Sequence, residues 1–121
     1  MLTLSSVLEI TKFDNYKVHA ARWNGEKQPL DALVEDPEGW VGWNSWRNAK
    51  DEFNLQFIVS LAAFYPERET WLFGGIFRVL ERDGIGERGY KIEPVDQAAE
   101  LIGRLKLTGA VSRGRSFLLP N

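Results

Sequence analysis

Two long apolar segments in the second half of the chain limit most strongly what it can fold into. They read FNLQFIVSLAAFY (residues 53–65) and TWLFGGIFRVLERD (residues 70–83), and only the polar sequence PERE separates them. Both are rich in β-branched and aromatic residues, which favour strands, and a short polar connection joins strands that pair antiparallel. We therefore predict that they form the central pair of a sheet. Gly74 and Gly75, inside the second segment, predict a bulge or a bend there.

Further strands and helices are predicted around this pair. Strand signals occur at residues 16–23, 90–95, 101–109 and 115–120, and helix signals occur at 4–10, at 29–36 and from Asp36 onward. Five or six strands, with the helices inserted after the first strand, predict an α+β fold. The expected architecture is a small, curved antiparallel β-barrel, and a length of 121 residues fits one domain, 1–121.

The last of these helices carries an unusual concentration of tryptophan. Asp36 is its predicted cap and Pro37 its first residue, and Trp40, Trp43 and Trp46 follow at intervals of three, so that they share one helix face. This face either packs against the sheet or lines a pocket that stacks on a flat ligand such as a nucleobase. Five tryptophans in 121 residues favour a partial pocket.

Two more tryptophans lie where strands begin or end. Trp23 closes the first predicted strand and Trp71 opens a central one, and both positions suit the rim of a cavity. The side chains of Asn24, Asn44 and Ser45 are candidate hydrogen-bonding groups for the edge of a bound base.

The sequence contains no recognisable catalytic centre. It has no cysteine, and His19 is the only histidine, so thiolate and histidine metal sites are not expected. No serine lies in a G-x-S-x-G sequence. GIGERG, residues 84–89, matches G-x-G-x-x-G, but a strand signal follows it, which favours a hairpin loop over a dinucleotide site. We expect no catalytic residue, no metal and no cofactor.

The net charge and the distribution of charge along the chain point to different kinds of partner. The net charge is −2 and the isoelectric point about 5.4, whereas nucleic-acid binders are usually basic. The last 21 residues nevertheless carry only basic charges: Arg104, Lys106, Arg113 and Arg115. The start of the chain lacks the pattern of a secretory signal, and no apolar stretch reaches the roughly 18–20 residues of a membrane helix, so a cytoplasmic protein without membrane contact is expected.

Two segments carry a resemblance to a known family. Residues 57–84, FIVSLAAFYPERETWLFGGIFRVLERDG, and residues 90–107, YKIEPVDQAAELIGRLKL, are similar to the domain that precedes the catalytic module in bacterial GIY-YIG nuclease proteins. WVGWNSW, residues 40–46, occurs there in the same order, and the similarity runs from Leu4 to Phe117. The GIY-YIG motif itself is absent. The resemblance implies a recognition domain that works with a nuclease in the same or another chain.

The GIFRVLE strand also resembles the PUA-like barrels, which include the EVE, YTH, ASCH and SRA groups. That resemblance implies a domain that binds RNA or DNA, in several cases by enclosing a modified base in an aromatic pocket. Trp23, Trp46 and Trp71 would then be pocket walls.

The leading hypothesis is therefore nucleic-acid recognition, of DNA rather than RNA, as a reader of modified bases associated with a GIY-YIG or restriction endonuclease. The expected binding residues are Trp23, Asn24, Trp43, Trp46, Arg47, Trp71, Arg104, Lys106, Arg113 and Arg115. The alternative is a protein-interaction or oligomerisation domain that uses an exposed aromatic patch. A third hypothesis, with less support, is a small-molecule hydrolase or lyase that uses Glu and Arg in the barrel mouth.

Overall fold

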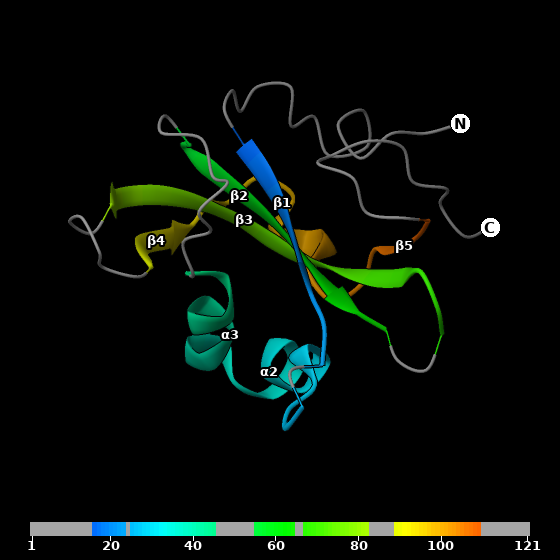
Figure 1. Ribbon diagram of the computed structural model, residues 1–121. Coiled ribbons are helices and arrows are strands. Elements are labelled where there is room, and N and C mark those ends of the chain that lie inside the picture. Colours follow the sequence, from blue (N-terminus) through cyan, green and yellow to red (C-terminus); the bar gives the residue numbers. More distant parts are fainter. Residues whose placement is uncertain (1–15, 24, 46–54, 65–66, 83–88, 110–121) are drawn as a thin grey trace.

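The computed structural model describes residues 16–23, 25–45, 55–64, 67–82 and 89–109 of the chain. The elements, in order, are β1 (Tyr16–Ala21), α2 (Pro29–Glu35), α3 (Pro37–Asn44), β2 (Phe57–Ala63), β3 (Thr70–Arg82), β4 (Tyr90–Pro94), the 3₁₀-helix η2 (Ala99–Leu101) and β5 (Lys106–Thr108). The strands form one sheet, with both α-helices inserted after β1, and the predicted α+β class is confirmed (Figure 1). The helix expected at 4–10 and the strand expected at 115–120 lie outside the described residues.

The predicted central pair is confirmed, because β2 and β3 run antiparallel side by side. Ser60 pairs with Gly75 and Leu61 with Phe73, so Gly74 is an extra residue in β3. This is the bulge that the glycine pair predicted, and Gly75 adopts a φ of 106°, a conformation that favours glycine. β4 and β5 pair with opposite ends of this long strand.

The expected antiparallel barrel needs correction in two respects. β1 pairs with β2 in parallel, from Tyr16 opposite Phe57 to Ala21 opposite Ala62. The reason is the connection: α2 and α3 carry the chain across one face of the sheet, so that β2 starts at the same end as β1 (Figure 1). Within the part of the chain that the structure describes, β1 pairs with neither β4 nor β5, so these strands form an open sheet.

The strand predicted for residues 101–109 is mostly wrong. Residues 99–104 form η2 and a turn, in which Gly103 has a φ of 72°, and only Lys106–Thr108 join the sheet as β5. This turn is tied to the central strand, because the Gly103 amide donates to the Phe73 carbonyl over 2.8 Å and the Phe73 amide donates to the Leu105 carbonyl over 2.9 Å.

Apolar side chains pack on both faces of the sheet. One cluster joins Val59, Leu61, Phe73, Ile76 and Leu107 to the segment around η2. The other joins Ile58, Ala62 and Phe77 to α2 and α3, mainly through Trp40. Side chains of β1 point alternately to the two faces, since Val18 and Ala20 pack on the first cluster and Ala21 belongs to the second.

Asp36 caps α3 as predicted, and because of this cap we expect alanine to change the stability differently at two glycines of that helix. The Asp36 carboxylate accepts from the Gly39 amide over 3.1 Å, and a Cβ at Gly39 would overlap that carboxylate. A Cβ at Gly42 would have nothing within 4 Å. We expect Gly42→Ala to raise the free energy of unfolding by about 1 kcal/mol through helix propensity. Gly39→Ala gains the same helix propensity but loses the cap hydrogen bond, which costs about 1 kcal/mol, so we expect no net change in the free energy of unfolding.

Urea titrations of the two variants and the parent protein measure this difference. An equal gain in both variants would contradict the role assigned to the Asp36 cap.

Candidate functional site

The structure gathers aromatic and basic side chains at one end of the sheet, where β1 and β2 end and β3 begins. Ala21 lies opposite Ala62, which lies opposite Leu72, and Leu72 lies opposite Lys106 of β5. This register brings together residues that are far apart in the sequence. We call this region the aromatic–basic end, which consists of Arg22, Trp23, Phe64, Trp71 and Lys106.

Arg22 and Trp71 form the best-defined contact of the aromatic–basic end. The Arg22 guanidinium carbon lies 4.9 Å from the centre of the Trp71 ring, a cation–π arrangement. Trp71 is only 3% exposed, and its Nε1 donates to the Gly109 carbonyl over 3.0 Å. The ring is thus part of the core and supports Arg22, so it offers no open face to a ligand, contrary to the role of pocket wall expected for it.

Trp23 differs from the other described tryptophans because it is on the surface. It follows Arg22 directly, and 60% of its surface is exposed. Its indole is accessible for stacking on a planar partner.

Lys106 is the second cation of the aromatic–basic end. Its Nζ lies 4.4 Å from the centre of the Phe64 ring and 2.8 Å from Glu67 Oε2. The ion pair neutralises part of its charge. Arg104 is exposed in the turn before β5. Arg68 is exposed in the turn before β3, between Glu67 and Glu69, which are also exposed.

Half of the predicted binding residues cannot be placed. Asn24, Trp46, Arg47, Arg113 and Arg115 lie outside the described residues.

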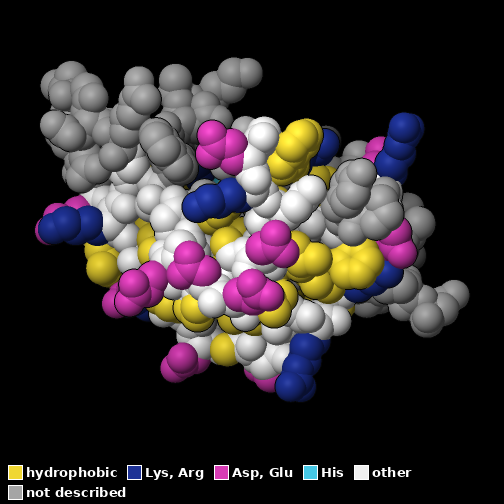
Figure 2. Space-filling model, turned by 90° about the horizontal axis from the view of Figure 1, so that it is seen from below, with side chains coloured by type: hydrophobic (Ala, Val, Ile, Leu, Met, Phe, Trp, Pro, Cys, Tyr) yellow, Lys and Arg dark blue, Asp and Glu magenta, His cyan; other side chains and the backbone are white. Residues whose placement is uncertain are grey.

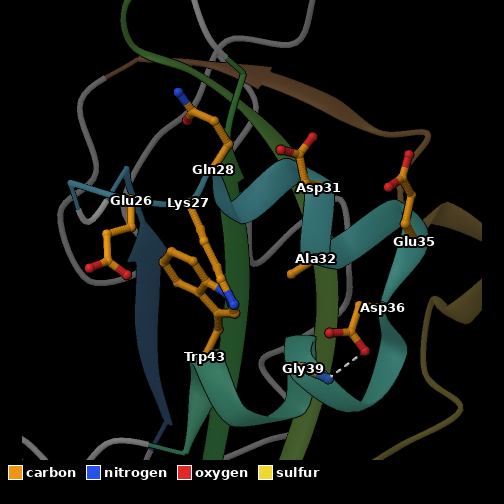
Figure 3. A pocket seen from close by; sticks show the side chains of 9 residues that line it. All are labelled: Glu26, Lys27, Gln28, Asp31, Ala32, Glu35, Asp36, Gly39 and Trp43. Atoms are coloured by element: carbon orange, nitrogen blue, oxygen red, sulfur yellow. Dashed lines mark hydrogen bonds between the residues drawn. The ribbon is translucent and has the colours of Figure 1, made fainter.

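Trp43 lies in a different environment from the aromatic–basic end. It is half-buried on α3, and it lines a cavity of about 360 Å³ together with α2 and residues 26–28 (Figure 3). The charged residues in the lining are Glu26, Asp31, Glu35, Asp36 and Lys27. Seen from the side of the helices, several Asp and Glu side chains spread across the middle of this face (Figure 2). Among the described residues, Trp43 thus lies with acidic side chains of α2 and α3, whereas Lys106 lies on β5 beside β3.

The two described tryptophans of α3 have different roles, and each matches one of the two alternatives left open by the sequence: packing against the sheet or lining a pocket. Trp40 is 4% exposed and packs on the sheet, with its Nε1 donating to the Gly74 carbonyl over 2.8 Å. Trp43, one turn further on, lines the cavity.

A buried polar network behind α3 was not expected from the sequence. Asn44 is 1% exposed, and its Oδ1 accepts from Ser60 Oγ over 2.5 Å and from His19 Nδ1 over 2.7 Å. Its Nδ2 donates to the Trp40 carbonyl over 2.8 Å. Asn44 thus holds α3 on the sheet and does not face a ligand, contrary to the role considered for it. The nearest sequence signal was a polar residue on the apolar helix face.

Among the described residues, no group of three or more His, Cys, Asp or Glu side chains is arranged to hold a metal ion. In the same part of the chain, no helix combines the length and the apolar character needed to span a membrane.

Comparisons with known proteins do not assign the chain to a family. No protein-family model matches it, and neither a curated protein nor a solved structure matches it. The resemblance to GIY-YIG nuclease proteins and to PUA-like barrels therefore stays a prediction from the sequence, and function must be argued from the geometry of the described residues.

Proposed function

We propose that this chain is a nucleic-acid recognition domain that binds at the aromatic–basic end. The observation that carries the proposal is that an exposed indole, Trp23, directly follows Arg22, whose guanidinium lies on the buried Trp71 ring. These are the two kinds of group that single-stranded nucleic acid or an unstacked base requires: a surface for stacking and a cation for phosphate.

The contact with the Trp71 ring favours phosphate binding by Arg22. A guanidinium stacked on a ring that is itself fixed by a hydrogen bond has fewer conformations to lose when it binds a phosphate. Lys106, Arg68 and Arg104 add positive charge at the same end of the sheet, beside the exposed Glu67 and Glu69. The acidic residues of α2 and α3 lie on the helices, which cover one face of the sheet (Figure 1). A polyanion would therefore approach the sheet end and avoid the helices.

The finer form of the proposal rests on the resemblance. A PUA-like domain would read a modified base, in DNA rather than RNA, and would act with a GIY-YIG nuclease in the same or another chain.

Binding can be tested with fluorescently labelled single- and double-stranded oligonucleotides, with and without modified bases, at two salt concentrations. Trp23→Ala is expected to weaken binding about 10- to 100-fold, because stacking contributes roughly 1–3 kcal/mol per base. Arg22→Gln is expected to weaken binding and to reduce the salt dependence by about one phosphate contact.

Leu80→Ala and Arg78→Gln are matched controls, because both residues are exposed on β3 away from this end. The proposal fails if no oligonucleotide binds at low salt or if binding is independent of salt.

The alternative, an interaction or oligomerisation domain, is favoured by the exposure of Trp23 together with that of Val34, which is 67% exposed on α2. Concentration-dependent dimerisation that is lost in Trp23→Ala, without nucleic-acid affinity, would support it.

A further inference from the structure

The two cations of the aromatic–basic end, Arg22 and Lys106, differ in how accessible they are to a phosphate. Arg22 is exposed, and its contact with the Trp71 ring leaves the edge of the guanidinium able to donate hydrogen bonds to an anion. The Lys106 Nζ, in contrast, lies 2.8 Å from Glu67 Oε2 and 4.4 Å from the centre of the Phe64 ring. A phosphate that binds Lys106 must displace the Glu67 carboxylate, or share the ammonium group with it against the repulsion of two negative charges.

The ion pair between Lys106 and Glu67 is better formed than other ion pairs on the sheet. Its N···O distance of 2.8 Å compares with 3.3 Å and 4.0 Å for two ion pairs that join β3 to β4. The Lys106 side chain is 33% exposed, whereas the cations of those two pairs are 69% and 55% exposed. A partly covered pair is screened less by salt than an exposed one, so Glu67 is an effective competitor for Lys106.

The backbone keeps the two residues of this pair within reach of each other. Glu67 lies in the turn between β2 and β3, which is closed by the Phe64 amide donating to the Thr70 carbonyl over 2.8 Å. Lys106 begins β5, which pairs with the start of β3, where Thr70 lies opposite Thr108 (Figure 1). Because the turn and β5 are both fixed to the start of β3, the contact does not depend on a remote segment.

We propose that Glu67 is a specificity-determining residue of the nucleic-acid site, because its carboxylate competes with backbone phosphates for Lys106. This inference rests on the proposed function. Phosphate contacts are the same for every sequence, so they add affinity without discrimination. By occupying Lys106, Glu67 keeps this sequence-independent part of the affinity low. Binding then depends mainly on the nucleotide that stacks on Trp23 and contacts Arg22.

The test compares two changes that remove the same charge from the same turn. The affinity for a fluorescently labelled single-stranded oligonucleotide is measured at one low salt concentration for the parent protein, Glu67→Gln and Glu69→Gln. Glu69 is exposed in the turn, as Glu67 is, and Lys106 pairs with Glu67. We expect Glu67→Gln to strengthen binding about two- to fivefold, the value of a partly exposed ion pair. Glu69→Gln should strengthen it less than about 1.5-fold, through long-range charge alone.

A double-mutant cycle assigns the gain to Lys106. Lys106→Gln is expected to weaken binding less than about twofold in the parent, where Glu67 occupies the ammonium group, and about two- to tenfold in the Glu67→Gln background. Urea titration of each variant supplies a second measurement. An ion pair with a purely structural role would lower the free energy of unfolding in Glu67→Gln and leave the affinity unchanged.

Two results would overturn the proposal while leaving the proposed function intact. One is an equal gain in affinity in Glu67→Gln and Glu69→Gln, and the other is an equal cost of Lys106→Gln in both backgrounds. The proposed function itself fails if neither the parent nor any variant binds an oligonucleotide, and the role of Glu67 then fails with it.

Discussion

Replacing Asn44 with alanine is expected to lower the free energy of unfolding by about 3–4 kcal/mol, the largest effect we predict for a single polar side chain. Asn44 is 1% exposed and completes three hydrogen bonds, to His19, Ser60 and the Trp40 carbonyl. Without it the Ser60 hydroxyl, which is fully buried, loses its acceptor, and a small cavity opens beneath α3. Denaturant titration with two-state analysis measures the loss.

Ser45→Ala is the matched control for Asn44→Ala. Ser45 is the next residue, and its hydroxyl donates to the Gly42 carbonyl over 2.9 Å at an exposed position. Its loss should cost no more than about 1 kcal/mol, because water replaces an exposed hydrogen bond. If both variants lost the same small amount of stability, the buried network would not be holding α3 on the sheet.

The second large effect is expected for Gly74→Ala, at about 3 kcal/mol of lost stability. The Trp40 indole lies directly over Gly74, and an added Cβ would overlap Cζ2 of that ring and lie 3.0 Å from Cε2. The ring cannot easily move away, because Trp40 is 4% exposed and its Nε1 donates a hydrogen bond to the Gly74 carbonyl. Thermal and urea unfolding of the variant measure the cost.

A double-mutant cycle separates this overlap from a general effect on β3. Trp40→Phe leaves a smaller ring, so Gly74→Ala should cost at least about 1 kcal/mol less in the Trp40→Phe background than in the parent. Additive effects would show that the glycine is needed for the backbone of the bulge and not for the indole.

Both predictions concern the packing of α3 on the sheet, and this packing also positions the cavity that Trp43 lines. Trp43 follows Trp40 by one helical turn and precedes Asn44 directly. Variants that loosen either anchor should therefore also disturb the cavity beside Trp43, whereas the aromatic–basic end, built mainly on β1, β3 and β5, should be less affected.

Local signals in the sequence determined several elements correctly. Pro29 begins α2, Asp36 caps α3 with Pro37 behind it, and Gly74 and Gly75 form a bulge in β3. These features depend on interactions within a few residues, such as a cap hydrogen bond or a permitted φ, so the residue types alone specify them.

Only the tertiary structure decided the direction of β1, the length of β5 and the position of each tryptophan. A strand signal fits a parallel neighbour as well as an antiparallel one, and the strand signal at residues 101–109 does not reveal the turn at Gly103. Trp40 and Trp71 are buried, Trp43 lines a cavity and Trp23 is 60% exposed. The burial of an indole depends on which distant segment packs over it, and residues far away in the sequence, such as Gly74 beneath Trp40, determine that packing.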